Sequence, residues 1–440
     1  MNNLTPIDRL IHARWIAPVV PENRLYENCS IAIHDGKILA ILPRNEADNT
    51  YIARHNHELN EHLLIPGLIN SHNHAAMSLL RGFADDKPLQ SWLQEYIWPA
   101  ESQWVDENFV KDGTELAMAE MIQSGTTCFA DMYFFPEQAA HAVLAAGMRA
   151  QITFPILDFP TAWGQNADDY INKGLALHDD FRACDTIRIG FGPHAPYTVS
   201  DAPLKRIATL ANELGAPIQI HLHETAHEIE QAQQDHQTRP IERLQNLGLL
   251  SPLTQCVHMT QVNDEDIELL QKSGAHVVHC PESNLKLASG FCPIDKLQKA
   301  GINVALGTDG AASNNDLDLI QEMRTAALLA KGVAANAEAC NAHQALQMAT
   351  LNGAKALGID DITGSLEIGK AADITAIDFS GLASQPIYNP VSQLVYSACG
   401  HHVSHVWCNG KALLSDGELQ TLNSHEIKAK AQEWGRRIRP

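Results

Sequence analysis

PGLINSHNH, residues 66–74, is an apolar run that ends in two histidines one residue apart. Side chains alternate along a β-strand, so His72 and His74 leave the same face and can hold one cation where the strand ends. Two segments far downstream carry further ligand types, HLHE at 221–224 and GTDG at 307–310. Three imidazole nitrogens and one carboxylate suit zinc or another borderline divalent metal and leave a coordination position for water. The sequence therefore predicts a metal-dependent hydrolase site.

The middle of the chain alternates between short β-rich runs and longer Ala- and Leu-rich stretches, and eight such units can be counted. Stretches such as 107–123 and 203–214 place apolar residues at helical spacing. Each short run is typical of a buried parallel strand, so the alternation predicts an α/β fold, a (β/α)8 TIM barrel over residues 63–365. The predicted strands are residues 63–70, 126–132, 149–157, 186–194, 217–224, 255–260, 276–282 and 303–309.

The two flanks, residues 1–62 and 366–440, have the alternating pattern of β-strands instead. SIAIHDGKILAIL contains an Asp35-Gly36 turn, and HVWCNGKALLSDGEL contains an Asn409-Gly410 turn. Neither flank has enough strands to bury two faces alone. We therefore expect the flanks to meet in space as one composite β-sandwich.

Composition limits the class of protein and its partners. The chain has 440 residues, 45% of them apolar, and a formal net charge of -21. An acidic chain is a poor partner for nucleic acid or an anionic membrane, which both require a basic face. Nine cysteines are scattered without paired spacing, and no uncharged apolar run reaches about eighteen residues. These features predict a cytoplasmic enzyme with reduced thiols and no membrane or nucleic-acid partner.

The candidate functional residues share one position in the predicted barrel, the C-terminal end of a strand. Active sites of TIM barrels are built at this rim, from the loops that follow the strands. The common location makes a joint role more plausible than seven ordinary core or surface side chains. The residues at these strand ends are His72 and His74 (first strand), His194 (fourth), His221 and Glu224 (fifth), His258 (sixth) and Asp309 (eighth).

These motifs, together with LEIGKAADITAID at 366–378, resemble the amidohydrolase superfamily, and within it the mononuclear deaminases. The stretch LRGFADDKPLQSWLQEYIWPAE, residues 80–101, is closely similar to the 5-methylthioadenosine/S-adenosylhomocysteine deaminase branch. The resemblance spans nearly the whole chain. It implies a barrel with a composite β-sandwich, one divalent metal per chain with zinc favoured, and an organisation that is often homo-oligomeric.

The resemblance also implies roles for individual residues. Glu224 is expected to shuttle protons, His258 to hydrogen-bond the reacting centre, and Asp309 to act in catalysis as well as in metal binding. The implied metal ligands are His72, His74, His221 and Asp309, and the implied substrate contacts are Glu101, Arg149, His194, Glu224 and Asp309.

The chemistry can be argued from the residues. Hydrolysis at C6 of adenine needs a strong nucleophile at neutral pH, and coordination to a divalent metal lowers the pKa of a water to about 7. Glu224 lies three residues after His221, near enough to accept the proton of the water and pass it to N1 and then to the departing amine. Asp309 can accept a hydrogen bond from the same water, and His258 can stabilise the developing charge on oxygen.

Glu101 points to the class of substrate. It follows Trp92 and Trp98 in a segment after the first strand, where a carboxylate can accept two hydrogen bonds from a ribose diol. Without the resemblance, Glu101 would be interpreted as a solvated surface side chain. With it, this position favours a nucleoside over a bare base: 5'-methylthioadenosine, S-adenosylhomocysteine or adenosine, converted to the inosine analogue and ammonia. The sequence does not rank these three, because the loops that meet the 5' group cannot be placed.

Other functions compete with this interpretation. A related mononuclear enzyme acting on guanine, cytosine or a chlorotriazine would keep the metal ligands and differ in the pocket loops. A non-catalytic binding protein on the same fold has no need for the full ligand set. A binuclear amidase usually has a lysine on the fourth strand, and residues 186–194 contain none.

The sequence does not decide the roles of several other residues. His221 and His223 share a strand face, so spacing alone does not decide which binds the metal. The end of the seventh strand, with His279, Cys280 and Ser283, either lines the pocket or packs inside the barrel. A cluster in the C-terminal flank is expected in a solvated loop or a subunit contact rather than at a second metal; it consists of His401, His402 and His405.

Overall fold

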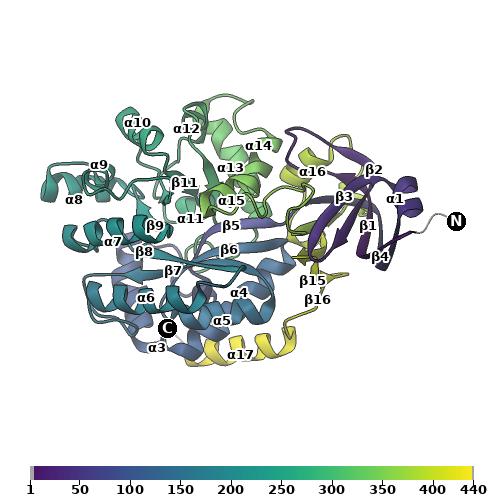
Figure 1. The fold of residues 1–440 in the computed structure, drawn as a ribbon. Helices are drawn as coiled ribbons and strands as arrows, with labels where there is room; N and C mark the ends of the chain where they lie inside the picture. The colour runs from purple at the N-terminus through teal and green to yellow at the C-terminus, as the bar shows by residue number, and fades with distance from the viewer. Residues whose placement is uncertain (1–3, 439–440) are drawn as a thin grey trace.

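The computed structural model describes residues 4–438, and its larger part is a parallel barrel. Eight strands pair in chain order, and β12 and β5 lie side by side, with the amide of Asp309 donating to the carbonyl of His72 at 3.1 Å. All eight predicted strands are confirmed, although most end earlier than predicted (Figure 1). Their bounds are β5 Leu68–Asn73, β6 Thr126–Met132, β7 Arg149–Ile156, β8 Ile187–Pro193, β9 Ile218–Leu222, β10 Thr254–His258, β11 His276–His279 and β12 Val304–Leu306.

Amphipathic helices cover the outside of the barrel. Helix α7 illustrates the pattern, because its buried residues Leu204, Ile207 and Ala211 share one face. It ends at Gly215, whose φ of 63° is the left-handed conformation that glycine favours at a helix end. The helices between and after the strands are α4 Glu107–Gln123, α5 Pro136–Ala146, α6 Ala167–Phe181, α7 Asp201–Leu214, α8 Ala226–His236, α9 Pro240–Asn246, α10 Asp264–Ser273, α11 Pro281–Lys286, α12 Ile294–Lys299, α13 Leu319–Ala334, α14 Ala342–Met348 and α15 Leu351–Leu357.

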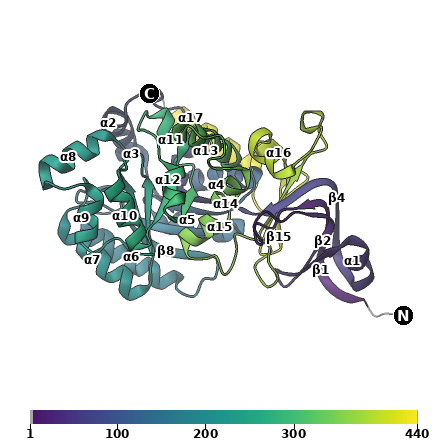
Figure 2. The same ribbon diagram turned by 90° about the horizontal axis from the view of Figure 1, so that it is seen from above.

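Both flanks contribute to one mixed sheet, which lies at the far end of the elongated molecule in Figures 1 and 2. Strand β4 joins the two parts of the sheet, since it pairs with β1 on one side and with β13 on the other. The predicted Asp35-Gly36 and Asn409-Gly410 turns are confirmed, with all four φ angles positive. The sheet has the order β16-β15-β14-β13-β4-β1-β2-β3, with β1 Thr5–Ile16, β2 Tyr26–His34, β3 Lys37–Pro43, β4 Tyr51–Pro66, β13 Ile374–Asp378, β14 Val403–Cys408, β15 Lys411–Ser415 and β16 Glu418–Leu419; helices α1 Arg44–Thr50 and α16 Pro390–Ser397 flank it.

The passage from the sheet to the barrel differs from the predicted strand 63–70. Residues up to Pro66 belong to β4, and the first barrel strand begins at Leu68. Gly67 separates the two, and a Cβ at this position would lie 2.1 Å from Oγ1 of Thr127. The junction between β4 and β5 packs closely against Thr127 of β6, and only glycine leaves room for this contact.

The last helix also departs from the predicted division of the chain. Helix α17, Ser424–Arg437, leaves the flank sheet and packs on α4 of the barrel (Figure 1). The ring of Trp434 meets that of Phe109 at 5.3 Å, and its Nε1 donates to Asp112 at 3.0 Å. Lys430 lies between Asp112 and Glu115, 3.2 Å from each. The segment expected in the sandwich thus ends as part of the barrel wall.

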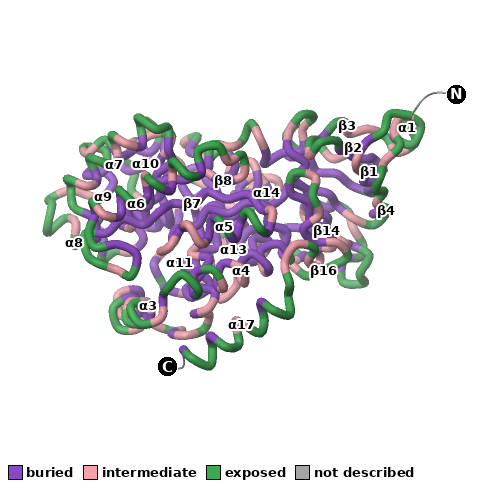
Figure 3. The backbone as a smooth tube through the Cα atoms, turned by 60° about the horizontal axis from the view of Figure 1, so that its bottom comes forward, coloured by how far each residue is buried: buried purple, intermediate pink, exposed green. Residues whose placement is uncertain are grey.

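Burial follows this architecture, with the barrel strands almost entirely enclosed (Figure 3). The nine cysteines are unpaired, as predicted. Across residues 4–438, we find no helix with the length and apolar character needed to cross a membrane.

Candidate active site

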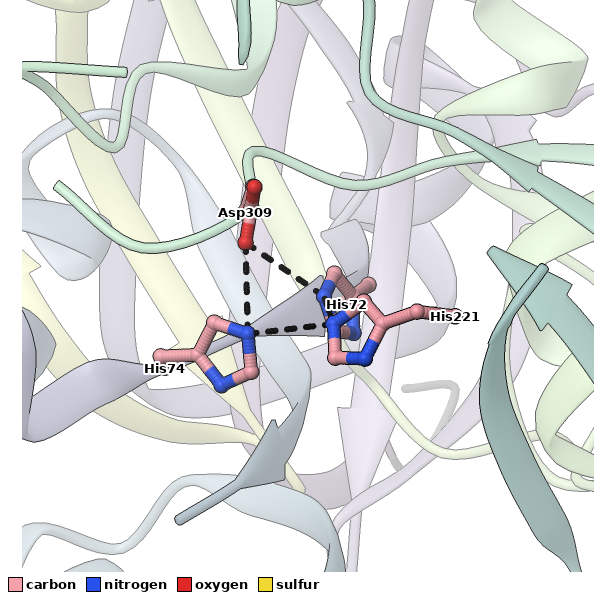
Figure 4. A group of neighbouring side chains, drawn as sticks. All are labelled: His72, His74, His221 and Asp309. Atoms are coloured by element: carbon pink, nitrogen blue, oxygen red, sulfur yellow. Dashed lines mark hydrogen bonds and ion pairs between the residues drawn. The ribbon is translucent and has the colours of Figure 1, made fainter. Parts of the chain in front are cut away.

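Four side chains on, or just after, strands far apart in sequence converge at the C-terminal rim of the barrel (Figure 4). The Nε2 atom of His221 lies 3.2 Å from that of His72 and 3.3 Å from that of His74. The Oδ1 atom of Asp309 lies 3.4 Å from Nε2 of His72 and 3.3 Å from Nε2 of His74. The structure thus brings together the four residues that the resemblance implied as ligands.

The hydrogen bonds behind the imidazoles test whether this cluster fits a cation. The Nδ1 atom of His72 faces Oε1 of Gln219 at 2.8 Å, that of His74 faces the carbonyl of Met132 at 2.5 Å, and that of His221 faces the carbonyl of His194 at 2.7 Å. An oxygen acceptor fixes the hydrogen on Nδ1, so each Nε2 presents a lone pair to the common centre. Lone pairs and a carboxylate oxygen that converge in this way repel one another unless a cation lies between them. The donor set therefore fits a divalent metal.

The Asp309 carboxylate is held by its neighbours. Its Oδ2 atom accepts hydrogen bonds from the hydroxyls of Ser283 at 2.7 Å and Ser313 at 2.8 Å. Its backbone has a φ of 62°, a strained conformation for a residue other than glycine. A Cβ at Gly307 would lie 2.8 Å from the amide nitrogen of His72, so this glycine lets the GTDG segment approach the first strand.

The alternative between His221 and His223 is resolved by the way β9 ends. The strand stops at Leu222, and His223 has a φ of 54°, so the chain turns before the second histidine. Its Nδ1 atom lies 3.1 Å from the carbonyl of Gln261, and its Nε2 accepts from the amide of Ile241 at 3.1 Å. His223 is therefore a buried support for neighbouring loops, and His221 alone of the two reaches the cluster.

Glu224 lies beside the cluster in a buried position. Its Oε1 atom accepts from the hydroxyl of Ser289 at 3.2 Å, and its Oε2 atom lies 3.7 Å from Nε2 of His258. Burial, and next the charge of Asp309, raise the pKa of Glu224 to about 8. The carboxylate of Glu228 accepts the amides of His223 and Glu224, at 2.9 and 2.8 Å, and so fixes this loop. A carboxyl group with a pKa near neutrality is suited to accept and return a proton.

Glu101 lies in the wall of the same cavity, on helix α3, Trp98–Trp104. The helix continues a short segment made of α2, Leu89–Ser91, and a π-helical turn, Trp92–Ile97. The hydroxyl of Tyr133 donates to Oε1 of Glu101 at 2.7 Å. Burial raises the pKa of Glu101 to about 7, and the hydrogen bond from Tyr133 opposes this rise.

A cavity of about 570 Å³ connects these groups, a size typical of a small-molecule site. His194 follows β8 and lines the cavity; its Nδ1 atom lies 3.1 Å from the hydroxyl of Thr198, and its ring lies 4.9 Å from that of His221. The polar lining also includes His74, Glu101, Ser102, Tyr133, Thr161, Tyr197, His221, Glu224, His258 and Asp309.

The structure corrects the expectation that Arg149 contacts the substrate. Arg149 begins β7 and therefore lies at the opposite end of the barrel from the catalytic rim. Its side chain is buried, with Nε 3.2 Å from Oδ2 of Asp373 and Nη2 2.6 Å from Oδ1 of Asn409. The side chain therefore links the N-terminal end of the barrel strands, called the barrel floor below, to the flank sheet.

The other residues whose roles the sequence left undecided lie outside the cavity wall. His279 and Cys280 are buried in the barrel, while Ser283 supports Asp309. His405 stacks on Trp407 at 5.4 Å between ring centroids. Over the described part of the chain, the groups with metal-binding geometry do not include His401, His402 or His405.

Sequence reasoning missed three residues that contact the catalytic groups or line the cavity beside them. Tyr133 directly follows the predicted strand 126–132, so the strand-end rule could have found it. Tyr197 and Ser289 lie in loops after the strands, and no spacing signal marks them.

Fold and site together define a barrel hydrolase of the metal-dependent class. The chain belongs to the amidohydrolase family, whose model matches residues 63–413. A 5-methylthioadenosine/S-adenosylhomocysteine deaminase of Saccharophagus degradans is 60% identical over 99% of this chain and 97% of its own length. A 5'-deoxyadenosine deaminase of Methanothermobacter thermautotrophicus is 43% identical over 84% of this chain and 86% of its own. The crystal structure of an adenosine deaminase from Xanthomonas campestris with bound zinc is 45% identical, with a TM-score of 0.98 over 99% of this chain and 100% of that one.

Proposed function

We infer that this protein is an adenosine-type deaminase that hydrolyses the 6-amino group of an adenosine derivative to give the inosine analogue and ammonia. One observation carries the inference: a single cavity reaches the His/His/His/Asp cluster at His74, His221 and Asp309, and its wall also includes Glu224 and Glu101. The curated relatives named as deaminases of adenosine derivatives support the same activity.

We propose a position for each end of the substrate. The purine C6 belongs at the cluster, where Glu224 and His258 face each other. The ribose belongs at Glu101, where Oε1 is engaged by Tyr133 and the carboxylate can accept the hydrogens of the 2' and 3' hydroxyls. A bare base would supply Glu101 with no donor beyond the Tyr133 hydroxyl, so the cavity favours a nucleoside.

The proposed mechanism uses Glu224 to move protons. We propose that it accepts one proton of the attacking water and delivers it to N1 of the purine. It then takes the second proton from the hydroxyl formed at C6 and passes it to the departing amine, so that ammonia leaves as C6 becomes a carbonyl. We propose that His258 donates to or steadies the oxygen that forms at C6 and that His194 contacts the purine, since both line the cavity beside Glu224. Ser289 orients the Glu224 carboxyl through its hydroxyl.

The cluster is proposed to hold one divalent cation, with zinc the favoured ion. His72, His74, His221 and Asp309 would hold it, because their free lone pairs and the carboxylate oxygen converge. The cation, when bound, lowers the pKa of a water so that it becomes a nucleophile at neutral pH. The bound zinc of the related deaminase from Xanthomonas campestris supports the choice of metal.

Turnover of a substrate panel tests this function. Zinc-loaded protein should release ammonia from 5'-methylthioadenosine, 5'-deoxyadenosine or adenosine, and far less from adenine, guanine or cytosine. Glu224→Gln keeps the shape of the side chain, and it should lower kcat at least about 10²-fold while metal content stays unchanged. Glu230→Gln, an exposed residue of the helix that follows the same strand, is the matched control. Efficient turnover of guanine or cytosine without turnover of nucleosides would overturn the assignment, and near-normal kcat in Glu224→Gln would remove Glu224 from the mechanism.

A further inference from the structure

The cavity wall away from the metal cluster is apolar. Side chains of the segment 89–105 and of the loops after β6 and β7 form this part, with Leu287 from the loop after α11. Such a wall gains free energy when apolar substrate surface leaves water. The apolar lining includes Leu89, Trp92, Trp98, Phe134, Phe159 and Leu287.

The charged groups of the cavity are all acidic or imidazole. Of the residues between 4 and 438, no lysine or arginine lines it, whereas Glu101, Glu224 and Asp309 do. A carboxylate bound in this space would therefore meet like charges and no cationic partner. Neutral donors such as Ser102 and Thr161 compensate a buried carboxylate less than a cation does.

Two lysines that neighbour lining residues in the chain are already engaged. Lys87, two residues before Leu89, lies with Nζ 5.5 Å from the ring centroid of Tyr96. Lys286, which precedes the lining residue Leu287, donates to Oδ1 of Asp85 at 2.7 Å. Moving Lys286 toward a ligand would break its ion pair with Asp85, and moving Lys87 would break its contact with the Tyr96 ring.

Resting on the proposed function, we propose that the 5' substituent accepted here is uncharged and apolar, such as a methylthio group or hydrogen. An adenosine with a zwitterionic amino-acid arm at 5' is selected against. The apolar wall stabilises a methylthio group, while the α-carboxylate of S-adenosylhomocysteine loses hydration without gaining a cation. We therefore expect kcat/KM for S-adenosylhomocysteine to be at least about tenfold below that for 5'-methylthioadenosine.

Three substrates separate charge from size. They are 5'-methylthioadenosine, S-adenosylhomocysteine and 5'-deoxy-5'-(n-butylthio)adenosine, which has an arm of similar length without charges. We expect the butylthio compound to react nearly as fast as the methylthio compound, and S-adenosylhomocysteine to react slowly. Equal kcat/KM for all three would overturn the proposal, and equally slow reaction of both long arms would replace the role of charge by one of size.

Phe159 is the position at which a cation can be added. It lies in the loop after β7, its side chain is 38% exposed, and its ring lies 6.1 Å from that of Trp98, also in the cavity wall. Phe159→Arg should raise the ratio of kcat/KM for S-adenosylhomocysteine to that for 5'-methylthioadenosine at least about fivefold, because the guanidinium supplies the missing partner. The matched variant Phe159→Leu should leave the ratio within about twofold. An unchanged ratio in Phe159→Arg that still deaminates 5'-methylthioadenosine would overturn the placement of the 5' group at this wall.

The outcomes distinguish this proposal from the proposed function. If the protein deaminates none of the three nucleosides, the assigned activity itself fails. If it deaminates the nucleosides but does not discriminate by charge, the activity stands and only the inference about the 5' group fails.

Discussion

Removing one hydroxyl, in Tyr133→Phe, should shift the pH at which the protein recognises ribose. Glu101 binds a diol as the carboxylate, so recognition is lost as pH falls through its pKa, which lies at about 7. The Tyr133 hydroxyl donates to this carboxylate at 2.7 Å and so favours the ionised form. Without it, the pKa of Glu101 must rise, and ribose recognition must move to higher pH.

The size of the shift follows from the hydrogen bond. A hydrogen bond to a charged group contributes about 1.5 to 3 kcal/mol, and one pKa unit corresponds to about 1.4 kcal/mol. The pKa of Glu101 should therefore rise by about one to two units in Tyr133→Phe. With a rise of about one unit, the ionised fraction at about pH 7 falls from roughly one half to about one tenth, an approximately fivefold loss that disappears above about pH 9.

The assay compares 5'-deoxyadenosine with its 2',3'-dideoxy analogue from about pH 5.5 to 9.5. Both compounds need Glu224 and the metal cluster, so the pH dependence due to those groups is the same for both. The ratio of the two kcat/KM values therefore reports the ionisation of Glu101 alone. Tyr197→Phe removes another hydroxyl from the cavity wall without a contact to Glu101 and should leave the midpoint unchanged. A ratio independent of pH in the wild type, or an unshifted midpoint in Tyr133→Phe, would refute the assignment of Glu101 to the diol.

Two further predictions concern the metal and the barrel floor. Elemental analysis of active protein should find about one zinc-like ion per chain, and His72→Ala or Asp309→Ala should lose both metal and activity; two tightly held ions would contradict a mononuclear centre. Arg149→Met should lower the free energy of unfolding by about 3 to 5 kcal/mol, because Asp373 would be left buried without its partner. The KM of Arg149→Met for the nucleoside should stay unchanged. An increased KM together with an unchanged free energy of unfolding would instead indicate that Arg149 contacts the substrate.

Local sequence was sufficient for the barrel and for three of the four residues of the His/His/His/Asp cluster. Buried parallel strands need continuous apolar runs, and the two-residue turns need residues that accept positive φ, so both leave readable patterns. The rule that TIM-barrel sites form at strand C-termini then selected His72, His74 and Asp309, which the structure brings together. The same rule located Glu224, and the resemblance added Glu101; both lie in the cavity wall.

Tertiary structure decided what depends on contacts between distant segments. Period-two spacing could not separate His221 from His223, because β9 ends between them and the backbone turns. The resemblance implied that Arg149 binds substrate, but the direction of β7 places Arg149 at the opposite end of the barrel, paired with Asp373. The pKa of Glu101 and the absence of lysine and arginine from the cavity wall within residues 4–438 likewise arise from loops that meet only in the folded chain. Sequence periodicity reports which face of an element is buried, whereas the partner of a buried polar group is set by the packing of elements far apart in the chain.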